Sequence, residues 1–285
     1  NGQILLTVDC DCSFDRHALR KLLQVLREDP GAAAVCGNIL VRNWRTNLLT
    51  RLQAIEYMIT ISLGKSLADA IGQVVCISGA FGAFRRQAWE AVGGHDVGPG
   101  EDADITFRLR IAGYRVRFAN NAICYTGVPV TLNALARQRG RWERDIFWIR
   151  FRKYGFLFDP SHQSFRASEL VNQLDFFIFT LLPTILFPVY FLYLVIMMPG
   201  FAVMLITAVV IALAFLDVFA FLLALSLLGR SEYVSLLLLA PLYGLGQAYG
   251  MRLLRLSAYL DEMIFSRSID DNFVPAKVRA WSIWR

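Results

Sequence analysis

Two aspartates near the start of the chain, Asp9 and Asp11, have the residue type and spacing of a site for a divalent cation. They follow a short apolar run, residues 3–8, which predicts a strand that is buried on both faces. Side chains two residues apart in an extended segment point the same way, so both carboxylates can face one site. Carboxylate oxygens hold Mg²⁺ or Mn²⁺ together with the phosphates of a substrate. The alternative is that the two aspartates only cap the turn after the strand.

A second acidic pair, Glu101 and Asp102, follows a Gly-Pro-Gly turn at residues 98–100 and begins a predicted helix over residues 101–112. The dipole of a helix stabilises acidic side chains at its amino end, and this explains many such pairs without any catalysis. The same dipole favours an ionised carboxylate, which is the form that accepts a proton from a substrate hydroxyl. Asp102 is therefore a candidate general base.

A third cluster, Gln138, Arg141 and Trp142, lies in a predicted amphipathic helix over residues 131–154. Residues at this spacing share one face of a helix. A guanidinium group binds a diphosphate through charge-assisted hydrogen bonds, and an indole ring offers a flat face on which a sugar can stack. The alternative is that arginine and tryptophan only anchor the helix at a membrane surface, and the two roles are compatible.

The order of the three clusters, D-x-D, then G-E-D, then Q-x-x-R-W, resembles that of the processive family 2 glycosyltransferases: the chitin, poly-N-acetylglucosamine, cellulose and hyaluronan synthases. The resemblance runs from about residue 5 to residue 159. It implies an inverting transfer of a sugar from a UDP-sugar with Mg²⁺ or Mn²⁺. It implies that Asp11 is a direct ligand of the metal and that Asp9 contacts the metal or the nucleotide. It makes Asp102 the general base, with Glu101 orienting the site.

The same resemblance assigns binding roles to two further groups of residues. Gln138, Arg141 and Trp142 would hold the donor diphosphate, and Trp142 also the acceptor end of the product. Ser78 and Gly79 lie where the family has a loop along the acceptor site, although core packing explains them equally well. Neither group is specific for one sugar, so we expect N-acetylglucosamine or glucose as the transferred unit.

Composition divides the chain into a basic half and an apolar half. The chain is 56% hydrophobic and 18% charged, with a mean hydropathy of +0.45, whereas a soluble domain has about 25% charged residues. The net charge of +6 lies entirely within residues 1–170. A basic half beside a membrane fits an anionic substrate and the cytoplasmic side of the bilayer. The sequence has no nucleic-acid-binding motif, so we expect no nucleic-acid partner.

An almost continuous apolar block over residues 176–250 predicts transmembrane helices, since about 20 apolar residues cross a bilayer. The block divides into three spans, residues 176–198, 201–228 and 233–249. The basic tail that follows, residues 251–285, favours a cytoplasmic end, which conflicts with an odd number of spans. Either a fourth pass or a re-entrant turn lies near Pro183 and Pro188, or the tail is outside.

Strand and helix patterns alternate in the front half, which predicts an α/β fold with a mostly parallel sheet; the resemblance makes this a GT-A-like nucleotide-sugar-binding domain. We expect four parts: a partial GT-A domain over residues 1–130, interfacial helices over 131–175, a transmembrane bundle over 176–250 and the tail over 251–285. The first residue lies inside a predicted strand, and the strands that hold uridine in the family have no counterpart. We therefore expect the chain to be part of a longer protein.

These observations predict a multi-pass enzyme of the cell membrane, with its catalytic domain in the cytoplasm. It would add sugars from a UDP-sugar to a growing β-linked polysaccharide and export the polymer through its membrane helices. Its partners would be the UDP-sugar, a polysaccharide or lipid acceptor, and membrane lipids. The second hypothesis is a single-transfer enzyme that makes a glycolipid, as ceramide glucosyltransferases do. The third hypothesis is a transporter or channel. Only Asp217, which lies inside the second span, supports it.

Overall fold

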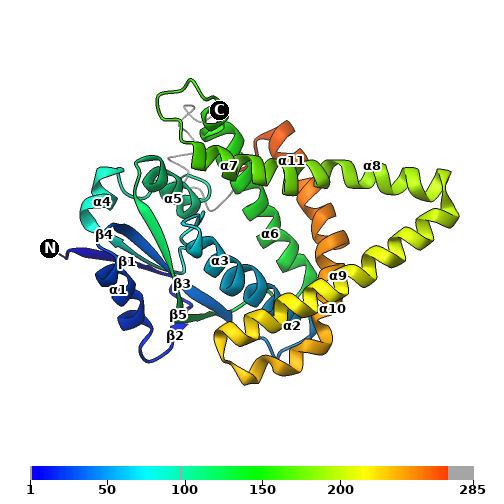
Figure 1. Ribbon diagram of the computed structural model, residues 1–285, viewed down its shortest axis with the longest axis horizontal. Helices are drawn as coiled ribbons and strands as arrows, with labels where there is room; N and C mark the ends of the chain where they lie inside the picture. Colours follow the sequence, from blue (N-terminus) through cyan, green and yellow to red (C-terminus); the bar gives the residue numbers. More distant parts are fainter. Residues whose placement is uncertain (1, 97, 269–285) are drawn as a thin grey trace.

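The structure is a computed structural model that describes residues 2–96 and 98–268, and it places a sheet at one end of the molecule (Figure 1). Within these residues, five strands form one sheet in the order β1-β4-β3-β5-β2. Their bounds are β1 Ile4–Val8, β2 Ser13–Phe14, β3 Ala32–Val41, β4 Phe81–Arg85 and β5 Arg115–Thr126. The central strand β3 is buried along its whole length, as its apolar sequence predicts.

The sheet is mixed, so the prediction of a mostly parallel sheet is wrong. Only β3 and β5 pair in parallel, whereas β1 with β4, β4 with β3, and β2 with β5 are antiparallel. The prediction came from apolar runs that were expected to be covered on both faces. This burial is present for β3 but not for β1, a strand at the edge of the sheet in which Leu6 and Val8 are exposed, so the predicted burial of residues 3–8 is wrong. Burial on both faces does not fix the direction of a strand, because helices can cover antiparallel strands equally well.

Helices cover both faces of this sheet. Around it lie α1 (Ala18–Glu28), α3 (Gly64–Ala70), α4 (Arg86–Ala91) and α5 (Glu101–Ile111). Helix α1 packs on β3 and β5 from one side, and α3 and α5 contact β5 from the other. Helix α2 (Leu48–Glu56) leads through a π-helical stretch, η1 (Tyr57–Leu63), directly into α3. A reciprocal pair of hydrogen bonds between Asn47 and Thr50 caps the start of α2.

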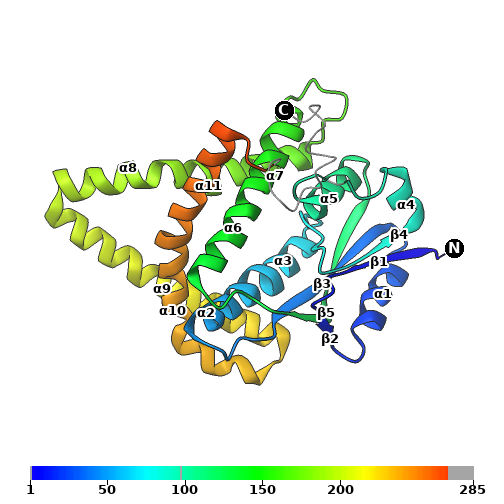
Figure 2. The same ribbon diagram turned by 180° about the vertical axis from the view of Figure 1, so that it is seen from behind.

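The predicted amphipathic helix is present as α6 (Leu132–Phe147), continued by the π-helical turn η2 (Trp148–Lys153). Thr131 begins it, because its side chain accepts a hydrogen bond from the backbone N–H of Ala134. A short 3₁₀ turn, η3 (Gly155–Phe158), then connects it to the apolar helices. In Figure 2, which shows the molecule from behind, α6 lies between the sheet and these helices.

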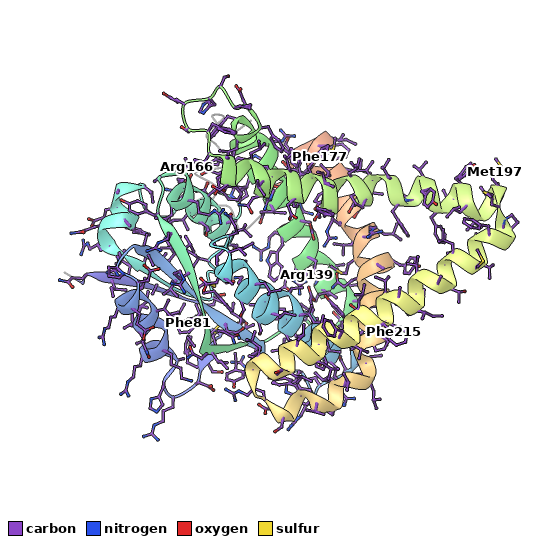
Figure 3. The ribbon with its side chains drawn as sticks, in the orientation of Figure 1. Phe81, Arg139, Arg166, Phe177, Met197 and Phe215 are labelled. Atoms are coloured by element: carbon purple, nitrogen blue, oxygen red, sulfur yellow. The ribbon has the colours of Figure 1, made fainter. Side chains whose placement is uncertain are left out.

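Three helical segments of the described chain are long and apolar enough to cross a membrane: residues 167–197, 199–228 and 231–265. The first contains α7 (Ala167–Phe176), η4 (Phe177–Leu181) and α8 (Leu182–Met197), and the second is α9 (Pro199–Leu228). The third contains η5 (Ser231–Leu239), α10 (Ala240–Leu245), η6 (Gly246–Met251) and α11 (Arg252–Phe265). Helices α8 and α9 meet near Met197, at the end of the molecule opposite the sheet (Figure 3).

Two details differ from the boundaries expected from the sequence. Pro183 and Pro188 lie within a continuous helical segment, so this stretch makes no re-entrant turn. Residues 252–265, expected in the tail, form helix α11 and lie along α6. Lys277 and Arg279 of the expected tail lie outside the described residues.

Polar contacts join α11 to the helix that carries the third cluster. The carboxylate of Glu143 in α6 accepts hydrogen bonds from Nε of Arg255 and from the hydroxyl of Tyr259, each at 2.8 Å. In a separate contact, helix α9 packs against η1. The apolar helices therefore contact the sheet domain through two elements. One is α6, and the other is the continuous helix formed by α2, η1 and α3.

Candidate active site

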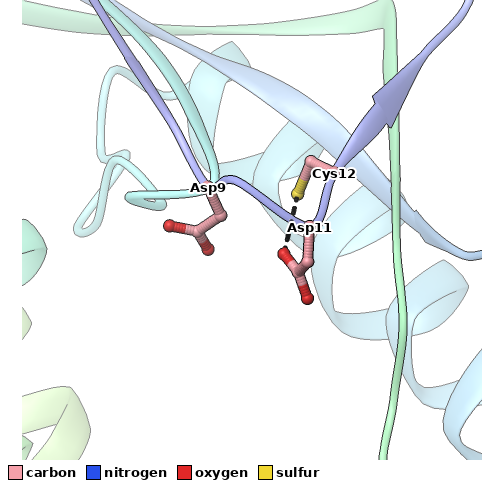
Figure 4. A group of neighbouring side chains, drawn as sticks. All are labelled: Asp9, Asp11 and Cys12. Atoms are coloured by element: carbon pink, nitrogen blue, oxygen red, sulfur yellow. Dashed lines mark hydrogen bonds between the residues drawn. The ribbon is translucent and has the colours of Figure 1, made fainter.

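The first acidic cluster lies directly after β1, where the strand leaves the sheet. The ligand atoms of Asp9, Asp11 and Cys12 lie within 4.8 Å of one another. Figure 4 shows both carboxylates directed toward the same open side of the turn. Nη1 of Arg42 donates a 2.8 Å hydrogen bond to the backbone oxygen of Asp11 and so holds this turn in place. The expectation that the two carboxylates face one side is met.

The charge of this cluster fits a cation of the Mg²⁺ or Mn²⁺ type. Partial burial, and then the charges of Asp11 and Asp102, raise the pKa of Asp9 above its usual value. A bound divalent ion would relieve this repulsion, and carboxylate oxygens are the ligands that such ions prefer. The thiol of Cys12 lies 3.7 Å from Oδ1 of Asp11 and forms the third member of the cluster.

The loop before β4 lies beside this cluster because β1 and β4 run antiparallel. The carboxyl end of β1 is thereby next to the amino end of β4, and the backbone N–H of Asp9 donates to the carbonyl of Ala80 at 3.4 Å. In the same loop, the N–H of Gly79 donates to Oδ2 of Asp102 at 3.4 Å. Ser78 and Gly79 thus lie between the two acidic pairs.

The second acidic pair begins α5, as predicted. Gly100 precedes it with a φ of 62°, a left-handed conformation that glycine adopts without strain. Oδ1 of Asp102 accepts a 2.7 Å hydrogen bond from the N–H of Ala103. Burial, and then the charge of Asp102, raise the pKa of Glu101, while the charge of Arg141 lowers it. The start of α5 is therefore within electrostatic reach of both other clusters.

The third cluster lies on α6 and faces this region through Arg141, whose charge acts on Glu101. Trp142 keeps 39% of its surface exposed, and the guanidinium of Arg139 lies 4.3 Å from the centre of a ring of its indole. Oε1 of Gln138 is buried and accepts no hydrogen bond from the described residues. The indole is thus held from one side and remains accessible, as a surface for stacking a ring requires.

All three predicted clusters therefore meet in one region, although they lie far apart along the chain. Asp9 interacts electrostatically with Asp102, and Glu101 with both Asp9 and Arg141. Chemically, this arrangement can hold a cation, bind an anionic group through arginine and accept a proton on a carboxylate. Asp217 stands apart from it. In α9, its carboxylate packs against Gly244 of α10.

The sequence analysis missed two cations next to the site, the buried Arg139 and the half-buried Lys65. Arg139 forms an ion pair with Glu56 in α2, at 2.9 Å. Lys65 in α3 donates a 2.7 Å hydrogen bond to the hydroxyl of Ser78. Arg139 stands between two residues of the third cluster, so its position was a signal. Lys65 gave none, because a single lysine in an apolar helix usually reaches solvent.

Known proteins resemble this chain in sequence and in fold. The model of the family described as "Glycosyl transferase family group 2" matches residues 4–248. Poly-beta-1,6-N-acetyl-D-glucosamine synthase of Staphylococcus aureus (strain COL) is 34% identical over 139 residues, which are 48% of this chain and 34% of that protein. The enzyme of the same name from Staphylococcus epidermidis is 30% identical over 141 residues, 49% of this chain and 34% of that protein. The matched region thus spans about a third of the length of these curated relatives.

Among solved structures, the mannosyltransferase PcManGT from Pyrobaculum calidifontis, in complex with GDP-Man and Mn²⁺, has a similar fold. The TM-score is 0.50 at 15% sequence identity, and the match covers 94% of this chain and 64% of that chain. At this identity the likeness concerns the fold alone.

Proposed function

This chain belongs to glycosyl transferase family group 2, and on that premise we propose that it adds N-acetylglucosamine from UDP-N-acetylglucosamine to a growing β-linked polysaccharide. The names of its curated relatives favour this donor and a polymeric product. UDP-glucose is the second donor to test, because the three clusters would contact the diphosphate half that the two donors share.

One observation carries this proposal: the convergence of the three clusters. The charges of Asp9, Glu101, Asp102 and Arg141 act on one another across a single region. An isolated acidic turn or an isolated helix start has a purely structural explanation. A purely structural role does not explain why both acidic pairs lie beside an arginine and an exposed tryptophan. Transfer of a sugar from a nucleoside diphosphate does explain it, because this reaction uses all of these groups.

In the proposed reaction, Asp102 takes the proton of the acceptor hydroxyl. The acceptor oxygen then attacks C1 of the sugar from the face opposite the diphosphate. The new glycosidic bond forms as the bond from C1 to the phosphate oxygen breaks, and UDP leaves with that electron pair. Attack from the opposite face inverts the configuration at C1. Glu101, next to the base, keeps the acidic region oriented toward Arg141.

Negative charge grows on the diphosphate while this bond breaks, and groups that stabilise it accelerate the reaction. Arg141 is placed to pair with the diphosphate, and Trp142 is placed to stack on a sugar ring. Asp9 and Asp11 would hold Mg²⁺ or Mn²⁺, and such an ion supplies charge neutralisation for the leaving group. The Cys12 thiol lies close enough to be a further ligand for a softer ion.

The membrane placement is part of the same proposal. Three apolar segments are long enough to cross a bilayer, and α6 lies between them and the sheet. The basic front half then faces the cytoplasm, where UDP-sugars are available, and the polymer leaves between the apolar helices. The matched region spans about a third of the relatives' length, so the activity of the whole protein is part of this proposal.

The proposal is tested in membrane vesicles that contain the full-length protein, with Mg²⁺ or Mn²⁺ and a panel of radiolabelled UDP-sugars. We expect label from UDP-N-acetylglucosamine in a product that is retained by size exclusion and degraded by a β-N-acetylglucosaminidase. Label that partitions into organic solvent would instead identify a glycolipid. Incorporation from none of the UDP-sugars would refute the proposed function.

A further inference from the structure

Lys65 in α3 is a half-buried cation that the proposed reaction does not use. Its ammonium group is turned inward, although part of the residue reaches the surface. Nζ donates to the hydroxyl of Ser78 at 2.7 Å and lies 3.3 Å from Sγ of Cys36 in β3. Lysine is almost never buried without a partner. In the described part of the chain, no ion pair joins Lys65 to a carboxylate, so its place needs another explanation.

The partner of Lys65 belongs to a loop that is bound to the first turn of α5. The N–H of Ile77 donates to Oγ1 of Thr106 at 2.9 Å, and this hydroxyl donates to the carbonyl of Asp102 at 2.7 Å. The N–H of Gly79 donates to the carboxylate of Asp102 at 3.4 Å. Residues 77–79 are therefore fixed to the backbone and the side chain of Asp102.

Lys65 fixes the same loop from its opposite side. Ser78 stands between Ile77 and Gly79, the two residues whose N–H groups reach α5. A movement of Ser78 would therefore change the hydrogen bond that Gly79 makes with Asp102. In addition, burial lowers the pKa of Lys65, whereas Cys36, Cys76 and, to a smaller extent, the charge of Asp102 raise it, and the net shift is upward. Geometry and charge thus both connect Lys65 to Asp102.

We propose that Lys65 is a positioning residue for Asp102, acting through Ser78 and Gly79 to keep this carboxylate aligned with the acceptor hydroxyl. The inference rests on the proposed function, in which Asp102 receives the proton. It does not involve the donor, whose diphosphate would meet Asp9, Asp11 and Arg141. Loss of Lys65 should therefore slow the chemical step while donor binding stays as it is.

The test compares four variants in membrane vesicles. Lys65→Met removes the ammonium at similar length, Ser78→Ala removes its partner, and a double variant carries both changes. Lys21→Met, on α1 and away from the site, is the matched control. For each protein, kcat per folded molecule and KM for UDP-N-acetylglucosamine are measured, and folding is checked by thermal unfolding.

We expect Lys65→Met to lower kcat roughly 10- to 100-fold, the scale on which a small misplacement of a catalytic group acts. KM for the donor should stay at the wild-type value, and Lys21→Met should behave as the wild type. The double variant should lose no more than Lys65→Met alone, because both residues act through one contact. Additive losses, or a raised KM with unchanged kcat, would show that Lys65 has no such role.

If Lys65→Met does not fold, Ser78→Ala decides the question. It leaves the ammonium in place and should lower kcat without changing the donor KM, and an unchanged kcat refutes the inference. Wild-type vesicles that incorporate label separate the two proposals. If they do so and Lys65→Met matches them, only the role of Lys65 is wrong. If they incorporate no sugar, the proposed function fails first.

Discussion

Gly100 lies so close to Ile149 that a Cβ atom on Gly100 would come within 2.7 Å of Cδ1 of that isoleucine. The same Cβ atom would lie 3.3 Å from Cβ of Asp145. Gly100 precedes the acidic pair of α5, and Asp145 and Ile149 belong to the helix that carries the third cluster. This contact therefore fixes the distance between the proposed base and the proposed diphosphate ligand.

Gly100→Ala should disturb this contact and strain the backbone. A left-handed conformation costs a residue with a side chain about 1–2 kcal/mol, and Ile149, which is fully buried, has little room to move. We expect a lower unfolding temperature and a loss of transfer that exceeds the loss of folded protein. Gly98→Ala is the matched control, because the space around Gly98 is open. Equal stability of the two variants would mean that the contact is not needed.

Asp102→Asn should abolish transfer without preventing donor binding. The amide keeps the shape of the side chain but cannot take a proton, and general base catalysis contributes roughly 10²- to 10⁴-fold to a rate. Binding of UDP-N-acetylglucosamine, measured by calorimetry, should stay near the wild-type value. Glu90→Gln, in an exposed ion pair with Arg86, is the control. Full turnover in Asp102→Asn would remove this residue as the base.

Binding of Mn²⁺ in the presence of UDP should weaken as the pH falls. The pKa of Asp9 is raised by burial and by the charges of Asp11 and Asp102. Protonated Asp9 is neutral and no longer attracts a cation, so protons compete with the metal as the pH drops through this raised pKa. Electron paramagnetic resonance of free Mn²⁺ measures the affinity at each pH. Asp9→Asn should bind more weakly and show a flatter pH dependence.

Asp11→Ala tests the metal site without a titration. We expect metal-dependent UDP binding to fall about 10-fold or more, since a carboxylate ligand contributes at least one charge-assisted interaction of this size. Removal of the metal by EDTA should then have less effect on the variant than on the wild type. The same response to EDTA in both proteins would argue that the cation binds elsewhere.

Local patterns predicted the elements of this fold, and contacts between distant segments decided the rest. The helix α5 has the predicted position, because the Gly-Pro-Gly turn directly before it sets its start. The antiparallel direction of β4 could not be read from its composition. Yet this direction is what brings Ala80 beside Asp9. The order of the three clusters predicted a shared site, but not which residues support it.

The supporting residues escaped prediction for a physical reason. Glu56 and Arg139 are 83 positions apart, and each alone reads as a charge on the polar face of a helix. Only the folded chain brings them together as a largely buried ion pair between α2 and α6. Lys65 meets Ser78 for the same kind of reason, through the fold of α3 beneath the loop. The charge pattern along one helix therefore predicts which residues are exposed, but not which charged residues pair in the interior.

Arg139→Met should destabilise the protein strongly, because it leaves Glu56 buried without its partner. Breaking a buried ion pair on one side costs about 3–5 kcal/mol, whereas replacing both partners is often close to neutral. We therefore expect a large fall in unfolding temperature for Arg139→Met and a partial recovery when Glu56→Gln is added. The variant also loses the guanidinium that lies over Trp142. In the double variant we therefore expect the unfolding temperature to recover more fully than the rate of sugar transfer.

The pH dependence of Arg139→Met provides an independent check. Burial raises the pKa of Glu56 above its ordinary value of 4.5, and the charge of Arg139 opposes this rise. Without Arg139, the folded-state pKa of Glu56 should rise further, so the folded protein binds a proton more readily than the unfolded chain. Its unfolding free energy should then increase as the pH falls through this raised pKa toward 4.5. Melting curves at several pH values measure this gain, which Glu56→Gln should abolish; the same gain in the double variant would place its origin at another group.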